Sequence, residues 1–174
     1  MNDVYQLMRR GTESITLSKY EQNDFPIYYS LVKEDHVMRY VSGKGLTVEE
    51  AWKKFTSIMA VNTENAEIGY FKIYNVAGDF IGDGKIEWNK HDNTKLEIGY
   101  ILKEVFWGKG YGTMICSKLL SKVDEIFPTM DVVGIIDPEN MASKNLLEKF
   151  GFKRYFLGVE DDLPTEKLIL SKSK

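Results

Sequence analysis

The chain has 174 residues, 43% of them apolar, and a formal net charge of −3, which suits one domain of ordinary size and argues against a nucleic-acid-binding protein with a basic face. The chain has a single cysteine, Cys116, which excludes an internal disulfide. Its only histidines, His36 and His91, lie far from Cys116 in the sequence, so we expect no metal site. The chain opens without an apolar signal segment and contains no run of about 18 apolar residues, which predicts a soluble cytoplasmic protein without a membrane partner.

The first part of the chain predicts a strand, a helical region and a regular helix. The strand covers residues 14–20, the helical or irregular region 24–41 and the regular helix 46–60. Thr47 and Glu50 form a capping box at the start of this helix, in which each side chain satisfies a backbone N–H of the first turn. The apolar residues of the helix share one face, namely Ala51, Trp52, Phe55, Ile58 and Met59.

The middle of the chain predicts a meander followed by a crossover. Three strand candidates joined by short loops favour an antiparallel meander and cover residues 67–75, 80–89 and 95–103. A helix is predicted over 112–127, because its apolar residues repeat at helical spacing and Pro128 follows. The apolar run 131–137 is typical of a central strand buried on both faces. The crossover would make it parallel to the strand before it.

The C-terminal part predicts a helix and a hairpin. The helix covers residues 141–150 and ends at Gly151, and the two strands cover 154–159 and 166–172. Strands, a parallel crossover and a terminal hairpin together predict an α+β fold with a mixed sheet. No linker or repeat divides the chain, so we expect a single domain over residues 1–174.

Gly108, Gly110 and Gly112 alternate with other residues immediately before the helix predicted at 112–127. Backbone N–H groups at a helix N-terminus have no partner inside the helix, and a glycine-rich loop lets them point together at an anion. Lys109 adds a positive charge and Thr113 a hydroxyl, so the stretch is typical of a pyrophosphate site. Its spacing fits neither the dinucleotide fingerprint nor a Walker A loop. A turn that merely caps the helix is the alternative.

The segments "EIGYILKEVFWGKGYGTMICSKLL" and "DPENMASKNLLEKFGFK", in this order, resemble the GNAT N-acetyltransferase superfamily. The likeness is greatest to its RimJ/RimL-like branch, which contains the ribosomal-protein alanine acetyltransferases, and it covers most of the chain. The acetyl-CoA signature of the family is Arg or Gln, two residues, Gly, one residue, then Gly or Ala. Gly110 and Gly112 match it, whereas Trp107 stands at the first position.

The resemblance implies a mostly antiparallel sheet with a central splayed parallel strand pair, flanked by helices. It also implies acetyl-CoA as co-substrate, with the pantetheine arm paired to the strand end and the pyrophosphate held by the glycine loop. A backbone N–H near Leu102 would polarise the acetyl carbonyl. The residues expected to bind CoA are Tyr100, Ile101, Leu102, Trp107, Gly108, Lys109, Gly110, Tyr111, Gly112, Thr113, Asn140 and Ser143.

Two residues are predicted to act in catalysis, Glu97 and Ser143. Many family members carry a tyrosine four residues after Ser143 that protonates the thiolate, but this chain has Leu147 there, so Ser143 or a water would donate the proton. Asn140 would contact pantetheine, although it is also a favoured N-cap residue.

Glu97 is the first choice for the base that deprotonates the amine. Glu87 is the second choice and Asp83 the third. The alternative for Glu97 is a strand-end carboxylate that faces solvent or pairs with Lys85 or Lys95.

Other side chains are weighed against structural alternatives. Cys116 lies on the apolar face of its helix and is interpreted as a buried structural cysteine rather than a nucleophile. His36 would line the acceptor pocket or be a surface histidine. Trp52, Trp88 and the tyrosines are expected mostly in the core, although Trp88 and Tyr28 or Tyr29 could wall the acceptor cleft.

The predicted function is transfer of an acetyl group to a primary amine by direct attack on the thioester. The acceptor would be a protein N-terminus, a polyamine or another small amine, and the sequence leaves this choice open. A non-catalytic acyl-CoA-binding or sensor module on the same fold is the alternative, and a protein that binds ATP or NAD is disfavoured by the glycine spacing. A homodimer is compatible with the sequence.

Overall fold

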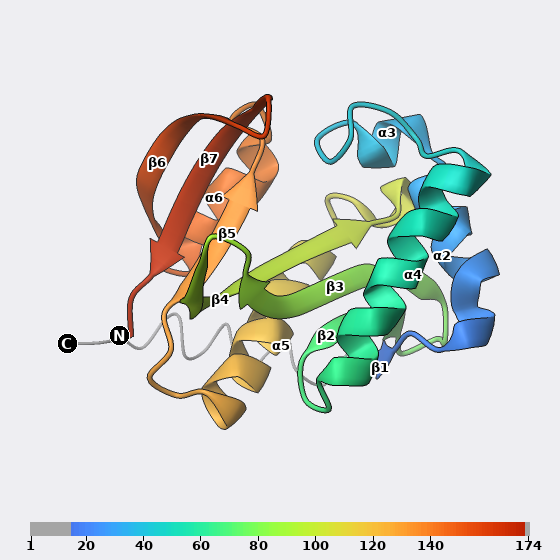
Figure 1. Cartoon of the computed structure of the whole chain (residues 1–174), viewed down its shortest axis with the longest axis horizontal. Coiled ribbons are helices and arrows are strands. Elements are labelled where there is room, and N and C mark those ends of the chain that lie inside the picture. Colours follow the sequence, from blue (N-terminus) through green and yellow to red (C-terminus); the bar gives the residue numbers. More distant parts are fainter. Residues whose placement is uncertain (1–14, 173–174) are drawn as a thin grey trace.

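A seven-stranded sheet in the order β1-β2-β3-β4-β5-β7-β6 organises the computed structural model, which describes residues 15–172 (Figure 1). Its strands are β1 (Ile15–Lys19), β2 (Gly69–Asn75), β3 (Phe80–Asn89), β4 (Asp92–Leu102), β5 (Val132–Ile136), β6 (Lys153–Glu160) and β7 (Leu163–Leu170). Its helices are η1 (Gln22–Asp24), α2 (Phe25–Val32), α3 (Asp35–Met38), α4 (Val48–Glu64), η2 (Glu104–Phe106), α5 (Tyr111–Ile126) and α6 (Met141–Lys149). The mixed α+β fold predicted from the sequence is therefore confirmed.

Strands β4 and β5 form the parallel pair of the sheet, and every other pairing is antiparallel. Their pairing covers three positions and ends at Ile98↔Gly134, although β4 continues to Leu102 and β5 to Ile136. Past these positions the two strands diverge, which confirms the splayed pair. The meander of β2, β3 and β4 and the hairpin of β6 and β7 agree with the sequence prediction.

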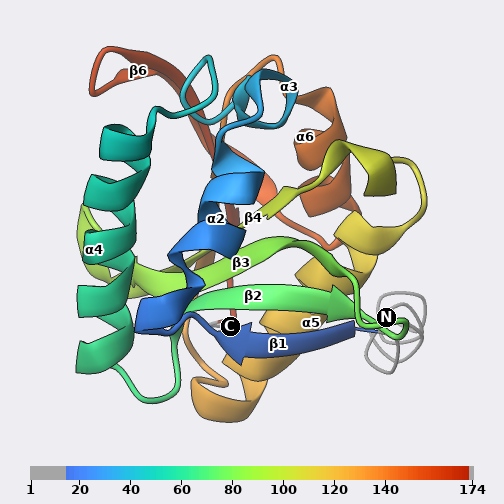
Figure 2. The ribbon, with the colours of Figure 1, turned by 90° about the vertical axis from the view of Figure 1, so that its right-hand side faces the viewer.

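The two faces of the sheet are covered by different helices. Helix α5 packs on one face, where Ile81, Ile86 and Leu119 belong to the larger apolar core. Helices α2 and α4 lie on the other side, around a second core that contains Tyr20, Tyr28 and Phe55. Figure 2 shows α2 and α4 in front of β2 and β3, with α5 behind them. Because side chains alternate along a strand, each strand contributes to both faces.

The ends of the elements follow local chemistry. The capping box of Thr47 and Glu50 is present at the start of α4, which runs beyond the predicted residue 60 to Glu64. Strand β4 begins at Asp92 instead of residue 95, because the turn after β3 is tight and Asp92 pairs with Asn89. Gly151 follows α6 in the left-handed region with φ 90°, as predicted. Residue 14, expected in the first strand, lies outside the described residues. Across residues 15–172, every helix is too short or too polar to cross a membrane.

Candidate active site

The glycine loop between β4 and α5 has a conformation that side chains disfavour. Gly108 has φ 69° and Gly110 φ 85°, both in the left-handed region. A Cβ at either position would meet no atom within 4 Å, so conformation and not space requires glycine there. Gly112 differs, because its Cβ would lie 3.0 Å from the Tyr100 hydroxyl and 3.4 Å from Leu146 Cδ2.

The loop presents backbone donors at the start of α5. Gly110 is the N-cap, and the first helical bond joins Met114 N–H to the Gly110 carbonyl at 3.2 Å. The amides of Tyr111, Gly112 and Thr113 precede that bond, and a glycine cap has no side chain to satisfy them. These amides and the positive end of the helix dipole suit an anion.

Trp107 anchors this loop to the end of β4. Its indole Nε1–H donates a hydrogen bond to the Leu102 carbonyl at 2.7 Å. Lys109 stays exposed, with Nζ 5.9 Å from the centre of the Phe106 ring. The tryptophan thus forms a hydrogen bond with the carbonyl of the last residue of β4. This bond gives the side chain at position 107 a structural role.

A cavity of about 960 Å³ opens where β4 and β5 diverge. It is lined on the β4 side by Gly99, Tyr100 and Ile101, and on the other side by residues from β5 and α6 that include Asn140 and Ser143. Five of the predicted site residues therefore meet around one cavity, namely Glu97, Tyr100, Ile101, Asn140 and Ser143. The residues of the glycine loop lie outside the lining, but Gly112 approaches it through the Tyr100 hydroxyl.

Asn140 and Ser143 begin helix α6. The Asn140 side-chain oxygen accepts a hydrogen bond from the Ser143 backbone N–H at 3.1 Å, so the capping role is confirmed. This bond leaves the Ser143 hydroxyl free to interact with the Tyr100 phenol. Burial raises the pKa of that phenol, and a hydrogen bond with Ser143 opposes the rise. The phenol beside Ser143 was missed from the sequence, which assigned Tyr100 a backbone role.

Leu147 fills the position of the absent tyrosine. It is buried, and its Cδ1 lies 2.6 Å from where a Cβ on Gly134 would be. Only glycine at residue 134 lets α6 approach β5 this closely.

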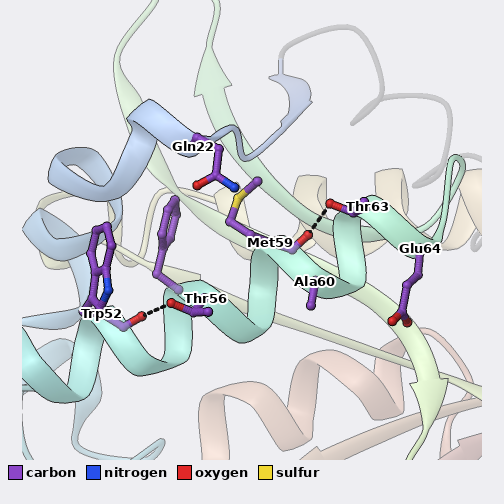
Figure 3. Close-up of a pocket in the computed structure, with 8 residues that line it drawn as sticks. Gln22, Trp52, Thr56, Met59, Ala60, Thr63 and Glu64 are labelled. Atoms are coloured by element: carbon purple, nitrogen blue, oxygen red, sulfur yellow. Dashed lines mark hydrogen bonds between the residues drawn. The ribbon is translucent and has the colours of Figure 1, made fainter.

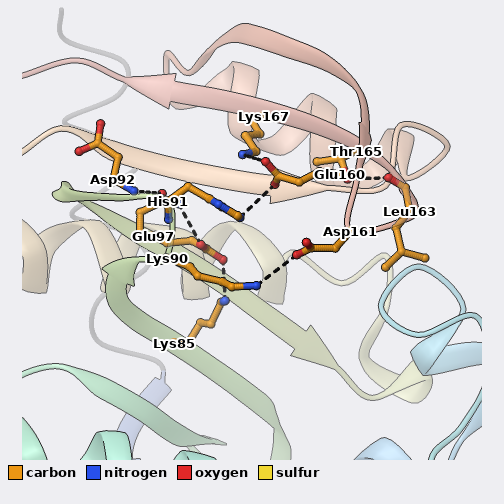
Figure 4. Close-up of polar contacts among 11 residues, drawn as sticks. Lys85, Lys90, His91, Asp92, Glu97, Glu160, Asp161, Leu163, Thr165 and Lys167 are labelled. Atoms are coloured by element: carbon orange, nitrogen blue, oxygen red, sulfur yellow. Dashed lines mark hydrogen bonds and ion pairs between the residues drawn. The ribbon is translucent and has the colours of Figure 1, made fainter.

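Charged side chains line the face of β3 and β4 that looks toward α4, and we call Asp83, Lys85, Glu87 and Glu97 the polar face. Lys85 Nζ lies 2.5 Å from Glu87 Oε1. It also lies 2.6 Å from Glu97 Oε1 (Figure 4). Asn89 donates a further hydrogen bond to Glu97 at 3.2 Å. The pKa of the Lys85 ammonium is raised: burial alone would lower it, but Glu97, with Tyr70 and Glu87, outweighs the burial. Glu97 thus forms the ion pair with Lys85 that the sequence analysis gave as the alternative to a role as the base.

Asp83 is one of the two buried carboxylates of the polar face, with 5% of its surface exposed against 9% for Glu97. It accepts a hydrogen bond from the Tyr20 hydroxyl at 3.4 Å. Burial raises the pKa of Asp83 to about 7, against hydrogen bonds from Tyr20 and the Ile101 amide that lower it. Asp83 was the third choice from the sequence, and its burial could not be read there because the groups around it, such as Tyr20, come from distant parts of the chain.

The remaining candidate residues differ in their burial and in their position relative to the cavity. Cys116 is buried, and burial raises the pKa of its thiol to about 12, which suits a structural residue. His36 is exposed and pairs with Glu104 at 3.2 Å, outside the cavity lining, so it is a surface histidine. Tyr28 lines the cavity. Trp88 packs instead on Phe127, with ring centres 5.3 Å apart.

Two turns meet across the mouth of the cavity. Lys90 pairs with Asp161 at 3.2 Å and His91 with Glu160 at 3.5 Å (Figure 4). These pairs join the turn after β3 to the turn between β6 and β7, so they connect the two sides of the splay. Being solvent-exposed, the Lys90 pair adds little stability.

A second hollow of about 410 Å³ lies along α4 and away from this site (Figure 3). Trp52 borders it with 53% of its surface exposed, so the prediction that Trp52 belongs to the core is wrong. The apolar face of α4 does point inward, but Phe25 from α2 packs against Phe55 there. Trp52 packs edge-on against Phe25, with ring centres 4.7 Å apart.

Comparison with known proteins bears on the site as a whole. Residues 14–153 match the family model of the acetyltransferase (GNAT) domain. An uncharacterized N-acetyltransferase of Bacillus licheniformis, p20, is 26% identical over 147 residues, which are 82% of this chain and 81% of that protein.

Solved structures share the fold. Spermidine N-acetyltransferase of Vibrio cholerae, in complex with CoA and spermine, has a TM-score of 0.73 and 17% identity over 91% of this chain and 95% of that one. RimL, a ribosomal L7/L12 alpha-N-protein acetyltransferase in complex with CoA, has a TM-score of 0.76 and 14% identity over 94% and 97%.

Proposed function

We propose that this chain, which belongs to the acetyltransferase (GNAT) domain family, is an acetyl-CoA-dependent N-acetyltransferase acting on a primary amine. One observation carries the proposal. The cavity at the β4–β5 splay is lined at one side by Tyr100 and Ser143, near the glycine loop, and at the other by the polar face. A thioester entering from the loop side and an amine entering over the polar face would meet in it.

CoA would be held mainly by the backbone. The amides that open α5 suit the pyrophosphate, and the edge of β4 from Tyr100 to Leu102, left unpaired by β5, suits the pantetheine arm. The left-handed Gly108 and Gly110 support this, because their conformation turns the chain toward the helix end. Asn140 lines the cavity with its cap bond intact.

The reaction would proceed by direct attack. The amine nitrogen bonds to the acetyl carbon, the carbon–sulfur bond breaks, and the electron pair leaves with sulfur, which takes a proton to give CoA. We propose Ser143 as the residue that delivers this proton and a carboxylate of the polar face, with Glu97 the choice from sequence, as the base.

The acceptor class is proposed as a protein N-terminus, a polyamine or a small amine. Two proteins that share the fold are named as a spermidine and a protein N-terminal acetyltransferase, so the fold serves both kinds of acceptor. A single domain over residues 1–174, a cytoplasmic location and a homodimer stay predictions.

Calorimetric titration with CoA, ATP and NAD tests the proposal first, followed by a panel of amines assayed for CoA release. We expect CoA to bind and at least one amine to release it from acetyl-CoA. Binding of ATP or NAD without CoA would overturn the proposal. CoA binding without turnover on any amine would favour the non-catalytic sensor, for which the leucine at residue 147 is the one supporting observation.

A further inference from the structure

We propose that Asp83, and not Glu97, is the catalytic base that receives the ammonium group of the acceptor and takes its proton. This inference rests on the proposed acetyl transfer and assigns one residue within it. Three observations carry it: the position of Asp83 beside the splay, the lack of a cation bound to it, and the groups that surround it.

Asp83 lies next to the diverging part of β4. It pairs with Ile101, three residues beyond Ile98, where the β4–β5 pairing ends. Glu97 pairs with Val133 inside the part that is still closed. The thioester is expected in the open part, so an amine that attacks it from the polar face would lie closer to Asp83.

The two carboxylates also differ in charge compensation. Glu97 shares the Lys85 ammonium with Glu87 and accepts a hydrogen bond from Asn89. Within residues 15–172, no lysine, arginine or histidine nitrogen lies within 4.0 Å of the Asp83 carboxylate. A buried carboxylate without a bound cation is costly, and an incoming ammonium would relieve that cost.

The surroundings of Asp83 suit a cation. The Tyr20 hydroxyl and the Ile101 amide hold its oxygens, and Tyr28 and Tyr70 line the same cavity. Tyrosine rings attract ammonium groups through their faces, and a carboxylate beside them fixes the charge. Lys72, the neighbour of Asp83 across β2, is occupied by Asp24 at 2.5 Å.

The titration of Asp83 agrees with this role. Burial raises its pKa to about 7, and the charges that act against the rise are Lys85 on its own strand and Lys54 on α4. A base with a pKa near the working pH is partly ionised and still accepts a proton readily.

The protons balance. One proton of the ammonium passes to an Asp83 oxygen before attack, and Asp83 later releases it to solvent. Ser143 gives its proton to the departing thiolate as the carbon–sulfur bond breaks, and a second proton that leaves the nitrogen restores the Ser143 hydroxyl. The products are the amide, CoA and one proton in solution.

The test compares Asp83→Asn with Glu97→Gln over a range of pH, using the best amine of the panel. In the wild type, kcat/KM should fall below pH about 7 as Asp83 becomes protonated. At pH 7, Asp83→Asn should lower kcat/KM by about 10² to 10³. The loss should shrink roughly tenfold per pH unit up to the pKa of the amine, because the variant depends on amine that is already neutral.

A loss that is the same at every pH would overturn the proposal, since it would indicate a structural role. A pH-dependent loss in Glu97→Gln instead would also overturn it and return the base to Glu97. Calorimetry of CoA binding distinguishes a failure of the proposed acetyl transfer from a failure of the role proposed for Asp83. A wild type that binds no CoA refutes the acetyl transfer itself, whereas with intact CoA binding a negative result refutes only the role of Asp83.

Tyr20→Phe decides the question if Asp83→Asn does not fold. It keeps the ring between Tyr28 and Phe55 but removes the hydroxyl that lowers the pKa of Asp83. The acid limb of kcat/KM should move to higher pH, with little change on the plateau. An acid limb that does not move would overturn the proposal.

Discussion

The two ends of the proposed active site, which consists of the cavity and the glycine loop beside it, are built from different parts of the chain. At the end where we propose that CoA binds, called the CoA end, the groups are backbone amides, glycines and the small Ser143, and they come from three short segments, 100–102, 107–113 and 140–143. At the acceptor end, they are side chains of the polar face, held by partners far away in sequence, such as Tyr20, which is 63 residues from Asp83. The CoA end is therefore sensitive to backbone conformation, and the acceptor end to charge balance.

The largest expected effect is a loss of CoA affinity when the glycine loop is changed. Gly110→Glu should weaken CoA binding by about a thousandfold, roughly 4 kcal/mol, measured by calorimetry. A side chain with φ 85° is strained, and the carboxylate would stand where the helix end attracts the pyrophosphate. The matched control is Gly78→Glu, because Gly78 has φ 84° and equally open space in the turn between β2 and β3. Equal CoA affinity in both variants would show that the loop is not the CoA site.

The next largest effect is a loss of stability when the charge balance of the polar face is changed. Lys85→Met should lower the free energy of unfolding by about 3 kcal/mol, because it leaves Glu87 and Glu97 facing each other without their cation. The pKa of Lys85 is raised in the folded state, so its contribution is complete below the unfolded value of about 10.4 and is lost as pH rises above it. The difference between wild type and variant, from urea unfolding, should thus shrink only above that pH.

The control for this variant is Lys33→Met, which removes an exposed pair with Glu34 at 3.8 Å. We expect a change of less than about 1 kcal/mol. If Lys85→Met were as mild as Lys33→Met, the polar face would not depend on its charge balance.

A smaller effect sharpens the comparison at the CoA end. Ser143→Ala should lower kcat by about tenfold to a hundredfold and leave CoA affinity nearly unchanged. Helix α6 should keep its cap, because Asn140 bonds the Ser143 backbone and not its hydroxyl. Tyr100→Phe removes the phenol next to that hydroxyl and should give a smaller loss. An unchanged kcat in Ser143→Ala would assign the proton to water.

The same difference explains what the sequence could predict. The glycine spacing, the capping box and the apolar periods act over a few residues, so the meander, the parallel crossover, the terminal hairpin and the glycine loop could be inferred, whereas the splay followed from the family resemblance. The environments of Glu97, Glu87 and Asp83 could not be inferred, because they depend on burial and on which carboxylates contact Lys85. Trp52 shows the same limit within a helix: its period placed it inward, but Phe25 from α2 decided its exposure.

The smallest effect concerns the helix that covers the acceptor end. Thr47→Ala should destabilise the protein by about 1 kcal/mol, because the Thr47 hydroxyl accepts the Glu50 N–H that begins α4. Thr63→Ala is the matched control in the same helix, since the Thr63 hydroxyl only bonds back to the Met59 carbonyl. Urea unfolding should separate the two variants, while kcat stays close to wild type in both, because neither residue lines the cavity at the splay. A fall in kcat with Thr47→Ala alone would instead mean that the first turn of α4 holds the acceptor end in place.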